Sequence, residues 1–326
     1  MDNDIFENLI QSNIKSSCNI HNNKIAVALS GGSDSLALTI ALKNLGYDIL
    51  AILVNHNLRK TSKEEIDKTI ITLEKFSIKY ALKEWNGHYQ NNLEAEAREN
   101  RYKLLIDTCH KEDIKYLFLG HHIDDQIETF LLNVARGSGL DGLCAMPKVI
   151  NVNDVQIIRP MLNLSKNDCQ NYLMNLNINW CEDESNNDIK YKRNKLRFLL
   201  EQIEDRELIT KRVCNTINIL QEVRVIIDDL VDATFNNYNI IKELEDKKHN
   251  TTFIEVNVEE FLKLKPYLQK SVITKCILKL SNRKYKLRFH QMVNIIECIT
   301  TMEKFKRSIS KCIIEKKGNK LLIKQF

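Results

Sequence analysis

The first 180 or so residues of the chain alternate short apolar runs with stretches that have the period of an amphipathic helix. Near-continuously apolar strands alternating with helices are typical of a doubly wound α/β domain, in which helices cover both faces of a mostly parallel sheet. The runs predicted as strands are KIAVAL (24–29), DILAILV (48–54), YALKEW (80–85), KYLFLG (115–120) and VQIIRPML (155–162). Helices are predicted at about 35–45, 62–76, 93–112, 124–135 and 165–177.

The alternation stops after about residue 205. Further along, the sequence predicts a long helix over 207–238, helices near 259–280 and 288–302, and a hairpin over 312–324 that turns around Gly318. We therefore expect two domains, an α/β domain over 1–205 and a smaller, mainly helical domain over 206–326 that ends in a hairpin.

The two expected domains differ in charge. Residues 1–205 carry 24 Lys and Arg against 29 Asp and Glu, whereas residues 206–326 carry 24 against 14. After Phe261 the imbalance is 17 against 3. So basic a stretch predicts a polyanionic partner such as a nucleic acid, the alternative being a merely solvated basic surface.

Composition limits the class of protein further. A hydrophobic content of 43% with 28% charged residues is ordinary for a soluble globular chain, and the longest apolar runs are too short to span a bilayer. The first residues lack the pattern of a targeting segment, so we expect a cytoplasmic protein without a membrane partner. The nine cysteines include no C-x-x-C pair, so their spacing supports no disulfide framework, zinc site or iron–sulfur site.

Polar clusters follow three of the predicted strands. SGGSDS (30–35) comes after the first strand, NHNLR (55–59) after the second and HHIDDQIET (121–129) after the fourth. In an open α/β sheet, ligands bind at the carboxyl ends of the strands. The three clusters therefore predict a single ligand site at that edge.

The bend SGGSDS predicts a phosphate site. A strand that enters a Ser/Gly bend and then a helix presents backbone N–H groups to an anion. Asp34 would repel a phosphate unless a cation lay between them, so the bend implies Mg²⁺ at Asp34. A plain glycine turn with a capped helix start would explain only Ser33 or Asp34. The predicted phosphate ligands are Ser30, Gly31, Gly32, Ser33, Asp34 and Ser35.

The cluster HHIDDQIET is open to three interpretations. Asp124 and Glu128 are four residues apart and share a helix face, while Asp125 and either His121 or His122 can point to the sheet edge. Histidine with carboxylates can bind a metal, although the H-E-x-x-H arrangement is absent. The other two interpretations are a solvated, capped helix start and an acidic pocket for a cationic substrate.

These motifs resemble those of a known family. SGGSDS after a strand resembles the PP-loop of the ATP pyrophosphatases, which cleave ATP between its α and β phosphates. The chain is similar to the tRNA(Ile)-lysidine synthases over residues 24 to about 200. The motifs that carry this similarity are VNHNLR (54–59), EAEARENRYKLL (94–105), GHHIDDQIETFLLNVARGSGLDGLCAM (120–146), IIRPML (157–162) and DESNNDIKYKRNKLR (183–197).

The resemblance implies a two-step reaction. With ATP and Mg²⁺, the family adenylates the wobble cytidine of a tRNA(Ile) that has a CAU anticodon. Free L-lysine then displaces AMP at C2 to form lysidine, which changes the codon read from AUG to AUA. The basic second domain would bind the tRNA. The number of chains in the assembly, a homodimer included, stays open.

The resemblance and the chemistry together assign roles to individual residues. The catalytic residues are predicted to be Asp34, His121, Asp124, Asp125 and Arg193. Besides the bend, the predicted ATP ligands are Val54, His56 and Gly120. The predicted ligands of lysine and tRNA are Arg98, His122, Glu128, Arg136, Asn194 and Arg197. One of Asp124 and Asp125 would accept a proton from the ε-amine of lysine, and the other would bind its α-ammonium group. The sequence leaves open which aspartate has which role.

Three other functions compete. A 2-thiolase of the same superfamily would activate a similar base oxygen, but such enzymes have paired cysteines near the site, and Cys144 and Cys181 are isolated. A synthetase that amidates a small molecule fits poorly with the basic second part. A non-catalytic RNA-binding module would not need Asp34 or the acidic cluster.

Overall fold

The computed structural model describes residues 1–20, 24–55, 62–85, 93–181, 192–246, 251–281 and 289–325. The chain divides into two compact units, Met1–Gln221 and Glu222–Phe326. The expected boundary at 205/206 coincides with the start of helix α9 (Arg206–Phe235), and the division between the units falls within that helix. In the described part of the chain, no helix combines the length and apolar character needed to cross a membrane.

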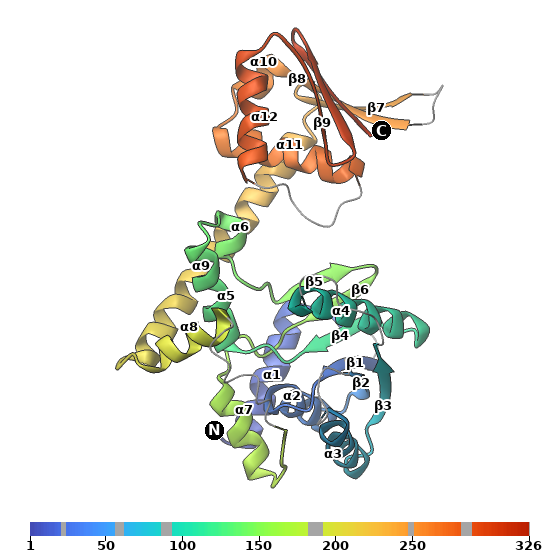
Figure 1. Cartoon of the computed structure of the whole chain (residues 1–326), viewed down its shortest axis with the longest axis vertical. Helices are drawn as coiled ribbons and strands as arrows, with labels where there is room; N and C mark the ends of the chain where they lie inside the picture. The colour runs from blue at the N-terminus through green and yellow to red at the C-terminus, as the bar shows by residue number, and fades with distance from the viewer. Residues whose placement is uncertain are drawn as a thin grey trace. The chain divides into compact units, whose positions relative to one another are not determined.

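A six-stranded sheet forms the centre of the first unit (Figure 1). Its strands are β1 (Lys24–Leu29), β2 (Asp48–Asn55), β3 (Lys79–Glu84), β4 (Tyr116–Leu119), β5 (Val149–Val152) and β6 (Val155–Ile158). The order is β3-β2-β1-β4-β6-β5, and every neighbouring pair is parallel except β5 with β6. This confirms the predicted α/β class and all five predicted strands.

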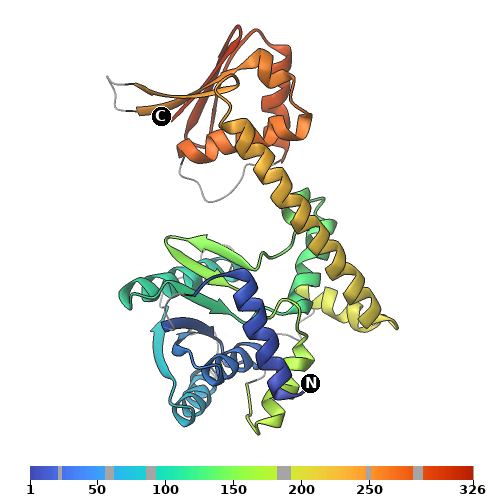
Figure 2. The same ribbon diagram turned by 180° about the vertical axis from the view of Figure 1, so that it is seen from behind.

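Helices cover both faces of this sheet. One apolar core joins the sheet to α1 (Asn3–Ser17), α2 (Ser33–Asn44), α3 (Ser62–Lys75) and α7 (Lys166–Asn175). A separate core on the other face joins it to α4 (Leu93–Lys111) through Leu105, Ile106 and Cys109. In the central strand β1, Val27 belongs to the first core and its neighbours Ala26 and Ala28 to the second, as strand alternation requires. Figure 2 shows α1 and α2 on the same side of the sheet.

Several elements of the first unit were not predicted from the sequence. They are α1, β5, the short helix α6 (Leu140–Leu143) and α8 (Lys192–Glu201), whereas α5 (Ile123–Ala135) confirms a prediction. Strand β5 is four residues long, and its turn into β6 places Asn153 and Asp154 at φ of 48° and 63°. Asn and Asp tolerate this left-handed conformation better than most residues.

The second unit combines helices with a five-stranded antiparallel sheet of order β7-β8-β11-β10-β9. Its strands are β7 (Ile241–Asp246), β8 (Thr251–Asn257), β9 (Lys304–Ile309), β10 (Cys312–Lys317) and β11 (Lys320–Gln325). The helices predicted over 207–238 and 288–302 and the β10–β11 hairpin are confirmed, while β7, β8 and β9 are additions to a region expected to be mainly helical. The predicted helix over 259–280 is divided into α10 (Val258–Leu262) and α11 (Pro266–Ser281), because Pro266 begins a new helix.

The sheet of the second unit is covered on one face. Alternate residues of the central strands, such as Ile254, Ile314 and Ile323, pack against α11 and α12 (Phe289–Thr301) in a single core. The intervening residues therefore point to the opposite face.

Candidate active site

The sheet order places a ligand crevice between β1 and β4. From β1 the chain moves to β2 and β3 on one side and then returns to β4 on the other, so the order reverses at this point. Such a reversal leaves a crevice at the carboxyl ends of the two strands. SGGSDS follows β1 and GHHIDD follows β4. The two segments touch, because a Cβ added at Gly120 would lie 2.9 Å from Cα and N of Ser35.

The bend after β1 leaves backbone donors available. Gly31 has φ of +85°, and a Cβ there would lie 2.6 Å from Oγ1 of Thr69, so only glycine fits. Gly32 is the N-cap of α2 and provides no side-chain cap. The hydroxyl of Ser35 instead accepts the N–H of Ser30 at 3.1 Å, which fixes the shape of the bend. The first N–H groups of α2 thus point out of the helix, an arrangement suited to an anion.

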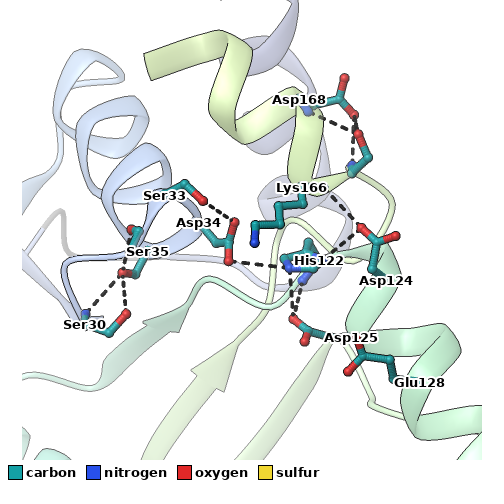
Figure 3. Close-up of polar contacts among 12 residues, drawn as sticks. Ser30, Ser33, Asp34, Ser35, His122, Asp124, Asp125, Glu128, Lys166 and Asp168 are labelled. Atoms are coloured by element: carbon teal, nitrogen blue, oxygen red, sulfur yellow. Dashed lines mark hydrogen bonds and ion pairs between the residues drawn. The ribbon is translucent and has the colours of Figure 1, made fainter. Parts of the chain in front are cut away.

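Asp34 lies in the first turn of α2 and faces the segment after β4 (Figure 3). Its carboxylate accepts a hydrogen bond from Ser33 Oγ at 2.9 Å and lies 3.5 Å from Nε2 of His122. Burial raises the pKa of Asp34, but His122, Ser33 and Lys166 together outweigh burial and hold it below the usual value. Asp34 is therefore an anion at neutral pH.

His122 joins three carboxylates. Its side chain is 5% exposed, with Nδ1 3.3 Å from Asp124 and Nε2 3.5 Å from Asp34 and 3.6 Å from Asp125. Burial disfavours the imidazolium, but the surrounding carboxylates prevail and raise the pKa of His122 to about 10. His122 is thus a buried cation, and Asp125 also accepts its backbone N–H at 3.1 Å.

Two arginines also pair with the acidic cluster, which comprises Asp34, Asp124, Asp125 and Glu128. Arg206 of α9 lies 2.9 Å from Asp124. Arg197 of α8 makes a two-pronged pair with Glu128, a side chain that is only 1% exposed, and lies 3.6 Å from Asp125. Burial opposes the charge of Arg197, yet its pairing with Glu128 raises its pKa.

This geometry disfavours the interpretation of the acidic cluster as a metal centre. Both ring nitrogens of His122 already face carboxylates, so neither points to an open position for a metal. The described residues contain no group of three or more His, Cys, Asp or Glu side chains arranged to hold a metal ion. Asp34 alone fits Mg²⁺ in its usual protein setting, where one or two carboxylates share the ion with substrate phosphates.

His121 does not join the acidic cluster as His122 does. Its Nδ1 is buried and has no hydrogen-bond partner within the described residues. Burial lowers the pKa of His121 to about 3, and the positive charges of Arg159, Arg98 and Arg101 add to this effect against the opposing charge of Asp125. His121 is therefore neutral, and Arg98 lies near it rather than near the carboxylates.

The remaining predicted residues are placed as follows. Val54 is half-buried in β2, and Asn194 is half-buried in α8. Arg136 is exposed at the C-cap of α5, about 12 Å along the helix from Glu128 and about 18 Å from Asp124. His56 and the segment 183–191 lie outside the described residues, as does the side chain of Arg193.

Two residues of the site were missed by sequence reasoning. The backbone N–H of Lys166 donates to Asp124 at 3.3 Å, and Figure 3 shows the Lys166 side chain extending toward Asp34. Ser165 caps α7 through Asp168, a start signal visible in the sequence, but nothing local connects that helix to Asp124. Arg206 begins a helix more than 80 positions after its partner and carries no motif of its own.

Comparison with known proteins identifies the domain and the fold. A family model described as a PP-loop domain matches residues 4–203, which include the bend and the acidic cluster. The U34-tRNA thiolase NcsA from Methanococcus maripaludis has a similar fold, with a TM-score of 0.51 at 19% identity over 65% of this chain and 80% of that chain.

Longer matches define the family. A tRNA(Ile)-lysidine synthase of Wolbachia sp. subsp. Brugia malayi is 33% identical over 312 residues, which are 93% of this chain and 71% of the relative. One of Rickettsia bellii is 34% identical over 308 residues, or 92% of this chain and 69% of the relative. The chain therefore belongs to the tRNA(Ile)-lysidine synthase family.

Proposed function

We propose that the protein joins free L-lysine to C2 of the wobble cytidine of a tRNA(Ile) with a CAU anticodon, consuming ATP and releasing AMP and diphosphate. The observation that supports this most is the contact between the amide-lined bend at residues 30–35 and a buried acidic cluster on the adjoining strand end. One part suits a triphosphate, and the other suits a cationic co-substrate.

In the first step, cytosine O2 attacks the α-phosphorus of ATP, and diphosphate leaves. The N–H groups of Gly32 to Ser35 would hold the phosphates, and Asp34 would hold Mg²⁺. Bound there, Mg²⁺ would neutralise charge that develops on the phosphate oxygens. Val54 and Gly120 are assigned to the nucleotide because they lie at the ends of β2 and β4, and His56 because it directly follows β2 in the sequence.

In the second step, the ε-amine of lysine attacks C2, the C2–O2 bond breaks and AMP leaves. The ammonium must first lose a proton, because its ordinary pKa is about 10.4. Burial raises the pKa of Asp124, but His122, Lys166 and Arg206 hold it well below the ordinary value, so Asp124 suits holding a cation better than accepting a proton. We therefore assign proton acceptance to Asp125 and ammonium binding to Asp124 and Glu128.

Arg197 and Asn194 would orient the amino acid from α8, and Arg193 is the second residue of the same helix. Arg197 already pairs with Glu128, so lysine would have to share or replace that partner. We assign Arg136 to the tRNA backbone, because it is exposed and distant from the acidic cluster.

The open face of the second sheet is the proposed tRNA surface. The side chains that point away from α11 and α12 include five exposed lysines: Lys304, Lys306, Lys317, Lys320 and Lys324. Only Lys317 and Lys320 have an acidic partner on the described strands, Glu315 at 2.8 Å and Glu255 at 3.2 Å. A face with this excess of lysine suits RNA phosphates. Since tRNA, ATP and free lysine meet in the cytoplasm, we propose that location.

The test is AMP release by the purified protein with different RNAs and amino acids. We expect one AMP for each lysine incorporated, and only with a tRNA that has a CAU anticodon. AMP release that needs the tRNA but not lysine would contradict the proposal and point to another modification, such as 2-thiolation.

A further inference from the structure

A second charged cluster lies at the same sheet edge, on the face covered by α4. It consists of Arg98, Arg101 and Tyr102 from α4, His121 after β4 and Arg159 after β6, and we call it the basic cluster. Its location follows from the topology. Helix α4 runs back across the sheet between β3 and β4, so its first turns lie at the carboxyl ends of the strands, where His121 and Arg159 begin the loops.

Contacts tie the cluster together. Arg98 and Arg101 are three residues apart on one helix face, and the guanidinium of Arg98 lies 5.4 Å from the centroid of the Tyr102 ring. Arg159 lies beside Tyr102, and its Nη1 donates to the carbonyl of Pro147 at 2.9 Å. Arg159 is therefore held between α4 and the segment that leads into β5.

Two buried nitrogens in this cluster lack partners. Arg159 is 5% exposed, yet its Nε makes no hydrogen bond within the described residues, and neither does Nδ1 of His121. No ion pair joins Arg98, Arg101 or Arg159 to a carboxylate in the part of the chain that the structure describes. A buried nitrogen without a hydrogen-bond partner and a group of arginines without a counter-ion both cost folding free energy. An anion that bound to these groups would remove that cost.

We propose that the basic cluster binds a phosphate of the RNA backbone beside the cytidine that is modified. This proposal rests on the proposed function. Arginine donors in a planar fork match phosphate oxygens, and the exposed Arg98 gives access from solvent while Arg159 closes the inner end. A base turned out of its stack needs its backbone held next to the reaction centre. The adjacent residues His121 and His122 would then separate the RNA phosphate from the lysine pocket.

The test compares two variants of equal charge change. In Arg98→Gln/Arg101→Gln the basic cluster loses two charges, whereas Lys103→Gln/Lys111→Gln removes two exposed lysines from the same helix. The probes are a tRNA transcript with a CAU anticodon, its isolated anticodon stem–loop and ATP. Circular dichroism and Tm establish that both variants fold.

We expect the arginine variant to bind both RNAs at least about tenfold more weakly, with a salt slope lower by about one for each phosphate that is no longer neutralised. The lysine variant should bind them almost as the unsubstituted chain does, and ATP affinity should be unchanged in both. Equal RNA affinity in the two variants would overturn the proposal, as would weaker ATP binding with normal RNA binding.

Arg159→Lys provides a second variant, because it keeps the charge but cannot supply Nε. We expect it to weaken stem–loop binding, and unchanged binding in a folded Arg159→Lys protein would also count against the site. Lysine incorporation by the unsubstituted protein tests the proposed function separately. A chain that binds RNA through the basic cluster but incorporates no lysine would refute the function alone.

Discussion

His121 and His122 are neighbours in the chain but lie in opposite electrostatic surroundings. His122 is enclosed by Asp34, Asp124 and Asp125, which raise its pKa to about 10. The pKa of His121 falls to about 3 because burial is reinforced by nearby arginines. One strand end thus divides the active-site edge into an acidic part whose carboxylates have cationic partners and a basic part whose arginines have no carboxylate partner among the described residues. The difference indicates that the acidic part is preorganised and that the basic part awaits an anion.

The largest expected effect comes from Asp34, at the edge of the acidic part. Asp34→Asn removes the carboxylate that we propose holds Mg²⁺, so lysine incorporation should fall at least about a hundredfold, while tRNA affinity stays nearly intact. The measurement is lysine incorporation together with tRNA binding. Asp107→Asn, on the exposed side of α4, is the matched control. Normal incorporation by the Asp34 variant would end the assignment.

The second-largest effect is expected from removing His122, the cation that lies between three carboxylates. His122→Gln leaves three carboxylates facing one another, so we expect lower stability and lower activity than in His121→Gln. Because the folded-state pKa of His122 is raised, its contribution to stability is full below pH 6.5 and is lost as pH rises toward 10. The Tm of the unsubstituted protein should therefore fall as pH rises over this range, and the Tm of the His122 variant should not show this fall. Parallel pH curves for the two proteins would contradict the prediction.

The Arg197–Glu128 pair should have a smaller, separable effect. Arg197→Met removes the arginine that pairs with the buried carboxylate of Glu128, which costs several kcal/mol in a fully buried pair and about 2–3 kcal/mol here, because a third of the Arg197 side chain is exposed. Denaturant unfolding measures the change in stability. The double variant Arg197→Met/Glu128→Gln should recover most of it, and additive destabilisation would show that the two side chains are not coupled.

The smallest effect is expected on the lysine face of the second unit, where each charge is exposed and screened by salt. Lys304→Gln/Lys306→Gln/Lys324→Gln should weaken tRNA binding and lower the salt slope by up to about 0.7–0.9 for each lysine that neutralises a phosphate. The matching Lys→Arg triple variant keeps the charge and should bind normally. If both triple variants bind alike, this face does not contact the RNA.

Features that depend on neighbouring residues could be predicted from the sequence. Contacts between residues far apart in the chain could not. The first strand, its Gly/Ser bend and the helix after it are specified within about 20 consecutive residues, and the structure confirms them. The neutralising partners Lys166 and Arg206 come from helices far along the chain and have no local signal, so only the fold places them beside Asp124. Strands β7 and β9 are edge strands rich in charged residues, which hides the apolar alternation that identifies a strand.

His121 and His122 show within one motif that the local sequence does not determine which side chains meet in the fold. The spacing in HHIDDQIET placed the acids on a helix start, but it could not tell which histidine faces them, because that depends on the contact of Gly120 with the N-terminus of α2. Arg101 and Arg159 were not predicted for the site at all. Their proximity depends on α4 packing across β4 and β6, which no local pattern encodes.

The central claim is that the bend between β1 and α2 grips the phosphates of ATP beside the acidic cluster. A crystal structure with Mg²⁺ and a non-hydrolysable ATP analogue tests it most directly. The account predicts phosphate density on the N–H groups of Gly32 to Ser35, with the metal on Asp34. A nucleotide bound elsewhere, with the bend unchanged and no metal on Asp34, would contradict it.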